Sequence, residues 1–92
     1  MEWHHFEYFK MLAETEHVTL AAKQLAVSQS ALSRAILKLE EELEVSLFDR
    51  RGRHIYLNAF GKEFLQYTNR ILYEMNEAKV RLKEMLELKK GP

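Results

Sequence analysis

The chain has 92 residues and a mass of 11.0 kDa, which suits one small domain and leaves too little for two. A content of 47% hydrophobic and 30% charged residues is typical of a globular protein, and one proline with three glycines argues against a many-turned β-sandwich or barrel. The lack of cysteine excludes disulfides and thiolate metal sites. No apolar run approaches the roughly 18 residues of a membrane span, so we expect a cytoplasmic protein with no membrane partner.

The charges cancel in total but are unevenly distributed along the chain. Residues 1–46 hold four basic and eight acidic residues, a net charge of −4, whereas residues 47–62 hold four basic and one acidic, a net charge of +3. The positive charge is therefore concentrated around the turn Arg51-Gly52-Arg53. Such a patch can meet phosphate, while the acidic surroundings weaken non-specific binding to nucleic acid.

Apolar periodicity predicts two helices before residue 26. The first covers 3–15 as an amphipathic helix and is followed by a connector at 16–18. We expect Thr19 to be the N-cap of a short second helix that ends near Leu25. Residues 26–28 then form a tight turn.

A third helix is predicted from Gln29, with Ser28 as its N-cap. Its buried stripe repeats at spacings of 4, 3 and 4 and consists of Leu32, Ile36, Leu39 and Leu43. The opposite face carries Gln29, Ser30, Ser33, Arg34, Leu37, Lys38 and Glu41.

The second half of the chain predicts a hairpin and one long helix. Two short runs, 47–50 and 54–57, flank Gly52 as a small hairpin that must lean on the helices. Asn58 can cap a helix from about residue 59 to 88, and Gly61 in its first turn indicates close packing. We expect a homodimer through an apolar stripe of this helix that consists of Phe64, Thr68, Ile71, Met75, Ala78, Leu82 and Met85. Its centre is expected at Ile71, Met75, Ala78 and Leu82.

Two helices joined by a three-residue turn, with short polar and basic side chains on the second, fit the reading of a DNA major groove. Gln29 can pair with adenine and Arg34 with guanine, each through two hydrogen bonds. Ser30 and Ser33 can bind either a base or a phosphate, and Lys38 is better placed for a phosphate. Taken alone, such a face is more often simply solvated; the small residues at the helix crossing and the adjacent arginine-rich hairpin favour binding.

The hairpin arginines have separate expected roles. Arg53, just beyond Gly52 at the tip, is expected to insert at or near the minor groove. Arg50 is expected to pack against its own domain or to reach a phosphate. A solvated turn is the plainer interpretation of all three arginines, Arg50, Arg51 and Arg53.

Other residues favour structural roles. The four histidines match no zinc spacing, and no set of nucleophile, base and acid can be assembled, so we expect no metal, no cofactor and no enzyme. Met75 and Met85 favour dimer packing over a ligand pocket. The candidate core aromatics and leucine are Phe6, Phe9, Leu32, Phe48 and Phe60.

One continuous motif resembles the DNA-binding segment of LysR-type transcriptional regulators. It reads Ala21-Ala22-x-x-Leu25-x-Val27-Ser28-Gln29-Ser30-Ala31-Leu32-Ser33-Arg34-x-Ile36-x-x-Leu39-Glu40-x-x-Leu43, followed by Leu47-Phe48-Asp49-Arg50. The resemblance implies a mainly α fold: a winged helix-turn-helix of three helices and a two-stranded wing over residues 1–58, then a linker helix over 59–90. It also implies antiparallel pairing of linker helices in a homodimer, and dimers joined into tetramers in full-length proteins. The implied partner is double-stranded promoter or operator DNA with an interrupted inverted repeat.

The resemblance assigns roles by position. It implies a recognition helix over residues 28–42, a phosphate contact from Thr19 and a wing contact from Arg53 that Arg50 or Arg51 supports. Base or backbone contacts are implied for Gln29, Ser30, Ser33, Arg34 and Lys38. Glu40, carried by the same motif, is expected either to be solvated or to pair with a wing arginine.

Three features depart from the family pattern. Glu44 stands where a glycine is usual, so either a left-handed cap costs about 1 kcal/mol there or the cap is not left-handed. Asn58-Ala59-Phe60-Gly61 replaces the usual Thr-Pro-Ala-Gly entry to the linker helix. The resemblance implies an effector-sensing C-terminal domain, which we expect to be absent here because we expect the chain to be a fragment.

Two functions from different classes are therefore open. The first is a sequence-specific, dimeric DNA-binding module of a bacterial transcriptional regulator. The alternative is a winged-helix protein-interaction module that dimerises through its long helix without DNA readout, which the zero net charge and the acidic first half favour.

Overall fold

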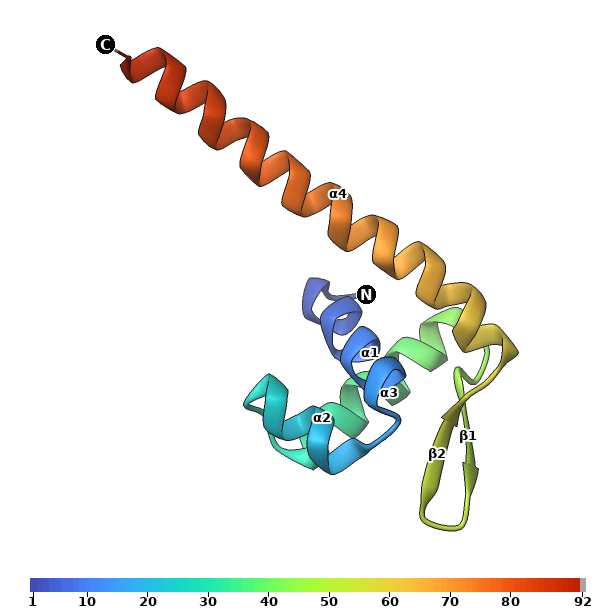
Figure 1. Ribbon diagram of the computed structural model, residues 1–92. Helices are drawn as coiled ribbons and strands as arrows, with labels where there is room; N and C mark the ends of the chain where they lie inside the picture. Colours follow the sequence, from blue (N-terminus) through green and yellow to red (C-terminus); the bar gives the residue numbers. More distant parts are fainter. Residues whose placement is uncertain (92) are drawn as a thin grey trace.

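A computed structural model describes residues 1–91 and confirms a mainly α fold with a small hairpin (Figure 1). Within that range the chain forms four α-helices and one two-stranded antiparallel sheet. In chain order they are α1 (Trp3–Thr15), α2 (Val18–Leu25), α3 (Gln29–Leu43), β1 (Phe48–Arg51), β2 (His54–Leu57) and α4 (Ala59–Lys90).

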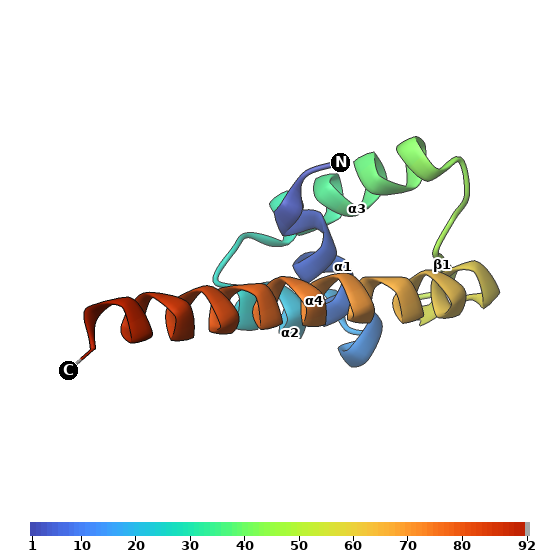
Figure 2. The same cartoon turned by 90° about the horizontal axis from the view of Figure 1, so that it is seen from above.

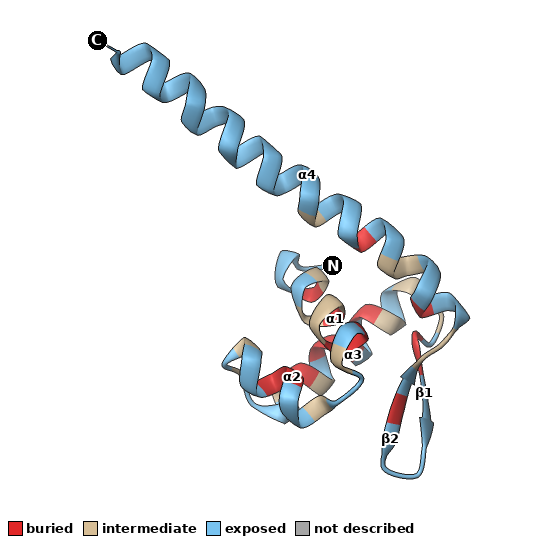
Figure 3. Ribbon diagram, viewed as in Figure 1, coloured by how far each residue is buried: buried red, intermediate tan, exposed pale blue. Residues whose placement is uncertain are grey.

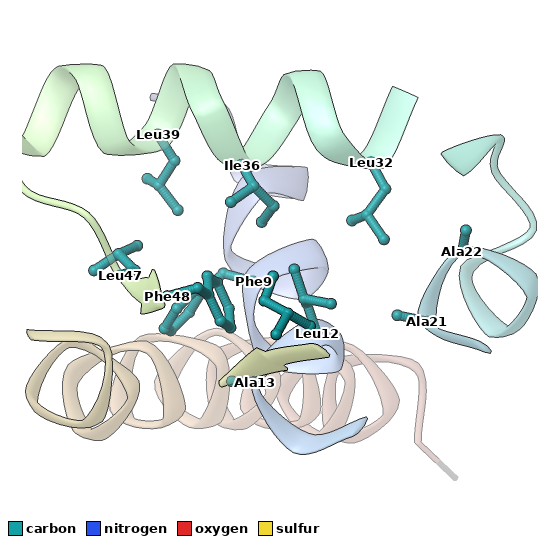
Figure 4. Packing of buried hydrophobic residues seen from close by; sticks show 11 residues of the cluster. Phe9, Leu12, Ala13, Ala21, Ala22, Leu32, Ile36, Leu39, Leu47 and Phe48 are labelled. Atoms are coloured by element: carbon teal, nitrogen blue, oxygen red, sulfur yellow. The ribbon is translucent and has the colours of Figure 1, made fainter. Parts of the chain in front are cut away.

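The core lies where α1 packs against the other three helices. In the view from above, α1 lies between α3 and α4 (Figure 2). Phe9 and Leu12 of α1 point into the centre, and Leu32, Ile36 and Leu39 of α3 face them (Figure 4). The hairpin contributes Leu47, Phe48 and Ile55. Burial of these side chains is the main force that holds the hairpin against the helices.

Side chains of three different types cap the helices. Ser28 Oγ accepts a hydrogen bond from the backbone N–H of Ala31 at 3.0 Å, and Asn58 Oδ1 accepts one from Gly61 at 2.9 Å, as predicted. The short second helix forms and ends at Leu25 as predicted, but the prediction of Thr19 as its N-cap was wrong. His17 is its N-cap, because the imidazole Nδ1 accepts from the N–H of Leu20 at 3.1 Å, and Thr19 lies inside the first turn.

Three helices end on non-glycine residues in the left-handed region. Glu16 ends α1 with a φ of 51°, Ala26 ends α2 with 58° and Glu44 ends α3 with 60°. The left-handed alternative for Glu44 is therefore the one adopted. Each such residue costs about 1 kcal/mol relative to glycine, which the surrounding packing offsets.

The first turns of α4 belong to the packed unit, and the rest of the helix projects from it (Figures 1 and 3). A Cβ at Gly61 would lie 2.2 Å from the carbonyl oxygen of Leu47, which confirms close packing. Thr68 is fully buried and donates its hydroxyl to the carbonyl of Phe64 at 2.9 Å. Because Gly61 faces the core, its neighbour Phe60 is turned outward with 59% of its surface exposed, so its core assignment was wrong.

The predicted dimer stripe divides into two parts. Phe64 packs in its own chain, with its ring 5.1 Å from that of Phe9 and 6.3 Å from that of Phe6, and it is half-buried there. Its contact with a second chain stays a prediction. Hydrophobic periodicity alone cannot tell burial within one chain from burial between two. Thr68 of the same stripe is also buried within its own chain. The other five stripe residues are exposed on α4: Ile71, Met75, Ala78, Leu82 and Met85.

Candidate nucleic-acid interface

The predicted recognition side chains lie on the outer face of α3. Leu32 and Leu39 are fully buried and Ile36 is 5% exposed, which fixes the rotation of the helix. Side chains on the opposite face must therefore point away from the core. Gln29, Ser30, Arg34 and Lys38 are exposed, and Ser33 is half-buried.

The connection between α2 and α3 holds the two helices close together. Ala21 and Ala22 are buried at the crossing, where larger side chains would push the helices apart. The N–H of Ala26 reaches the carbonyls of Ala22 and Lys23, and the N–H of Val27 bonds to Ala22 at 3.0 Å. These bonds close the end of α2, and Ser28 then begins α3. The two helices form a helix-turn-helix.

The strand register separates the hairpin arginines onto opposite faces. Arg50 pairs with Ile55 and Arg51 pairs with His54, and paired residues share one face of a sheet. Ile55 is buried, so Arg50 lies on the face towards α3. Arg51 lies on the other face, with its guanidinium 6.0 Å from the centre of the Tyr56 ring. Gly52 and Arg53 form the two-residue turn of the hairpin. Gly52 has a φ of 61°, and Arg53 is exposed.

An open cleft lies between the hairpin and the start of α3. It brings together five predicted site residues that are distant in sequence, namely Thr19, Gln29, Ser33, Arg50 and Arg53. A second hollow continues along α3, and Ser33 and Arg50 line both. The remaining predicted residues, Ser30, Arg34, Lys38 and Arg51, lie outside the lining of the two hollows.

The cations of this surface are not neutralised by the chain itself. In the part of the chain that the structure describes, ion pairs join the Met1 amino group to Glu42, Lys10 to Glu14 and Arg81 to Glu84. None of them involves the five site cations Arg34, Lys38, Arg50, Arg51 and Arg53. Their guanidinium and ammonium groups are therefore available to an external anion such as a phosphate.

The side chains of Glu40, Asn58 and Glu16 anchor the base of the hairpin by hydrogen bonds. Glu40 Oε2 accepts from the N–H of Leu47 at 2.6 Å, so its predicted pairing with a wing arginine was wrong. Asn58 Nδ2 donates to the carbonyl of Ser46 at 2.8 Å. Glu16 Oε2 accepts from the N–H of Leu57 at 2.7 Å. These bonds fix the position of the hairpin relative to α3.

Five residues that line the cleft were not predicted as site residues, and three of them are polar: Glu16, His17 and His54. Glu16 and His17 come from the connector before α2, and His54 begins β2. No local pattern marks them, because the cleft exists only once the hairpin folds back beside α2 and α3. Preferred N-cap residues do not include histidine, so His17 also carried no capping signal.

Two further observations concern metal ligands and membrane-spanning helices among the described residues. Residues 1–91 contain no group of three or more histidine, aspartate or glutamate side chains placed to hold a metal ion. None of the helices in this range combines the length and hydrophobicity that a bilayer crossing requires.

The helix-turn-helix and its adjoining two-stranded hairpin define a winged helix-turn-helix protein. Residues 3–62 match the family model described as "Bacterial regulatory helix-turn-helix protein, lysR family". The chain belongs to the LysR family.

Relatives and solved structures agree with this assignment. The chain is 46% identical over 91 residues to two Bacillus subtilis (strain 168) proteins, the uncharacterized HTH-type transcriptional regulator YybE and the transcriptional dual regulator GltC. These alignments cover 99% of this chain but 31% and 30% of those proteins, so the chain spans about a third of their length.

Two similar structures are DNA-binding domains solved with DNA. The CbnR domain superposes with a TM-score of 0.88 at 36% identity, over 95% of this chain and 100% of that one. The BenM domain on benA site 1 DNA superposes with a TM-score of 0.87 at 34% identity, over 92% of this chain and 99% of that one.

Proposed function

We propose that this chain is the sequence-specific DNA-binding module of a bacterial transcriptional regulator. Residues 28–42 read the major groove, and residues 50–53 of the wing contact the adjacent minor groove or backbone. One observation carries the proposal. Gln29 and Ser33 of α3 line the same open cleft as Arg50 and Arg53 of the wing.

The size and chemistry of α3 suit this role. A major groove about 12 Å wide admits one helix, and short or flexible polar side chains can then reach the base edges. Gln29 and Arg34 supply hydrogen-bonding groups that match adenine and guanine. The phosphate contacts fall to the flanking residues Thr19 and Lys38, together with the wing. The DNA complexes of CbnR and BenM domains support the same use of the fold.

We also propose that the module acts as a homodimer through α4. Ile71 and Met75 are 37% and 41% exposed, and Leu82 and Met85 are 64% and 52% exposed. Ala78 lies between them on a helix of 32 residues that projects from the packed unit. A second α4 would cover these side chains, and two recognition helices would then read an interrupted inverted repeat in a promoter or operator. In a full-length protein, two such dimers would form a tetramer.

Sedimentation tests the dimer. We expect a two-chain species at tens of micromolar, a rough working range for weak dimers. Met75→Glu places a charge in the apolar stripe and is expected to give monomers. Glu77→Ala, an exposed change on the same helix, is the matched control. A wild-type chain that sediments as a monomer would remove this part of the proposal.

The zero net charge favours a second candidate, a protein-interaction module whose α3 face does not contact DNA. A salt titration of duplex binding separates the two. Each phosphate contact contributes a slope of about −0.9 to the logarithm of the association constant against the logarithm of salt concentration. DNA binding predicts a steep negative slope. Arg53→Ala should reduce the magnitude of this slope by about 0.9, the contribution of one phosphate contact. No binding to any duplex would favour the interaction module.

A further inference from the structure

Leu37 is an apolar side chain on the otherwise polar outer face of α3. Its side chain is 58% exposed, whereas Leu32, Ile36 and Leu39 of the same helix are at most 5% exposed. The core therefore uses the other side of α3, and Leu37 contributes little to it. Two exposed cations flank it, Arg34 one turn before and Lys38 next in sequence.

Leu37 continues the row that begins with Gln29 and Ser33. Residues four positions apart lie on one face of a helix. Gln29 and Ser33 line the first hollow beside the wing, and Ser33 and Leu37 line the second together with Arg50. At 1.5 Å per residue, Leu37 lies about 12 Å beyond Gln29 along the helix. That span equals three to four base pairs at about 3.4 Å each, so one half-site can contain the whole row.

The chemistry of a leucine restricts what it can read. It has no donor or acceptor, so it gains nothing from the hydrogen-bonding edges of the bases. Among the groups that the four base pairs present in the major groove, the C5-methyl of thymine is the apolar one. Contact between this methyl and the Leu37 side chain removes both from water.

We propose that Leu37 is a specificity-determining residue that selects thymine through contact with its 5-methyl group. The proposal rests on the proposed function, because it requires α3 to lie in the major groove. The selected thymine lies in the same half-site as the bases that Gln29 and Arg34 read, displaced from them towards the part of the DNA that faces the second hollow.

The test uses the 92-residue chain and duplexes selected from a random pool by the wild type. Each thymine of one half-site is replaced singly by deoxyuridine, which keeps base pairing and removes only the methyl group. We expect one replacement to weaken wild-type binding about three- to fivefold, the effect that burial of one methyl group supports. Leu37→Ala should lose sensitivity at that same position and bind the thymine and uracil duplexes equally.

Two controls keep the outcome interpretable. Leu88→Ala makes the same chemical change at a leucine that is 79% exposed near the end of α4, and it should retain the uracil effect. Thermal unfolding followed by circular dichroism should show Leu37→Ala folded, because the side chain lies outside the core. A pool in which the wild type selects no sequence would overturn the proposed function and this proposal together. A selected site with no methyl-dependent thymine, or with one whose effect survives in Leu37→Ala, would overturn the Leu37 contact alone.

Discussion

Glu16 and Leu57 lie 41 positions apart in sequence, and a 2.7 Å hydrogen bond joins the carboxylate of Glu16 to the backbone N–H of Leu57. This bond links the end of α1 to the last residue of β2. It therefore connects the helices to the wing beside the proposed DNA-binding cleft, which Glu16 also lines.

Loss of this bond should loosen the wing. Glu16→Ala is expected to lower the free energy of unfolding by about 1 kcal/mol, the usual net contribution of such a hydrogen bond. Glu16→Gln keeps an acceptor oxygen and should cost less. Both substitutions leave a non-glycine residue in the left-handed conformation, so the backbone cost cancels between them. Denaturant unfolding checks the ranking, and an alanine variant as stable as the wild type would contradict it.

Gly61 is required by packing and not by backbone conformation. A Cβ there would lie 2.2 Å from the backbone oxygen of Leu47 and 2.4 Å from Cδ1 of Leu57. We expect Gly61→Ala to destabilise the fold by about 2–3 kcal/mol, because the backbone oxygen cannot move aside cheaply. Gly52→Ala is the comparison: its Cβ meets open space, and only the positive φ costs about 1 kcal/mol. Denaturant unfolding of both variants measures the difference, and equal losses would contradict the packing argument.

Arg34 is expected to read a base. Arg34→Ala should lose about 1–3 kcal/mol of binding free energy on a selected site and relax the preference at one base pair. Lys38→Ala is the matched control on the same face, and it should weaken all duplexes about equally, as a phosphate contact does. Competition binding against selected and random duplexes distinguishes the two patterns. Equal weakening by Arg34→Ala on both kinds of duplex would assign Arg34 to a phosphate.

The strand register predicts different roles for neighbouring wing arginines. Arg50 lies on the hairpin face towards α3, and Arg51 lies on the opposite face near Tyr56. Arg50→Ala should therefore weaken DNA binding more than Arg51→Ala does. Arg53→Ala should weaken it most on sites with a narrow minor groove, where the negative potential is strongest. Affinities on two duplexes that differ only in flanking A-tracts measure both effects, and equal affinities for the Arg50 and Arg51 variants would contradict the register argument.

His5 makes stability depend on pH. Burial lowers the pKa of His5 below its usual value of about 6.5, and the neighbouring His4 lowers it further. The unfolded chain then binds a proton more readily than the folded one, so the free energy of unfolding should fall as pH drops below about 6.5. His5→Gln keeps an acceptor for the N–H of Glu2, which bonds to His5 Nδ1 at 3.2 Å, and removes the titration. Unfolding at pH 7.5 and 5.5 should show a smaller pH effect in His5→Gln than in His4→Gln, and equal effects would contradict the assignment to His5.

Local signals predicted most of the fold, because each is contained in a few neighbouring residues. The periodicity of α1 and α3 and the capping groups of Ser28 and Asn58 act within one or two helical turns. The errors involve partners distant in the chain or an unusual residue type. His17 caps α2 with a ring nitrogen. Phe60 is turned outward because Gly61 beside it packs against the backbone of Leu47, 14 positions away.

The site was predictable as a set of residue types but not as a shape. The exposed row of α3 follows from the buried stripe on its other side. The cleft that joins Thr19, Gln29 and Arg53 depends on how the hairpin folds back, which the hydrogen bond between Glu16 and Leu57 helps to fix. The separation of Arg50 from Arg51 follows from a register that sequence spacing alone did not establish.

Methylation protection on a selected duplex tests the central claim most directly, because dimethyl sulfate attacks guanine N7 in the major groove and adenine N3 in the minor groove. Contact of Arg34 with a guanine edge predicts that the bound chain protects one guanine N7 in each half-site, and that Arg34→Ala loses this protection. Binding that leaves every guanine N7 reactive would contradict the placement of α3 in the major groove.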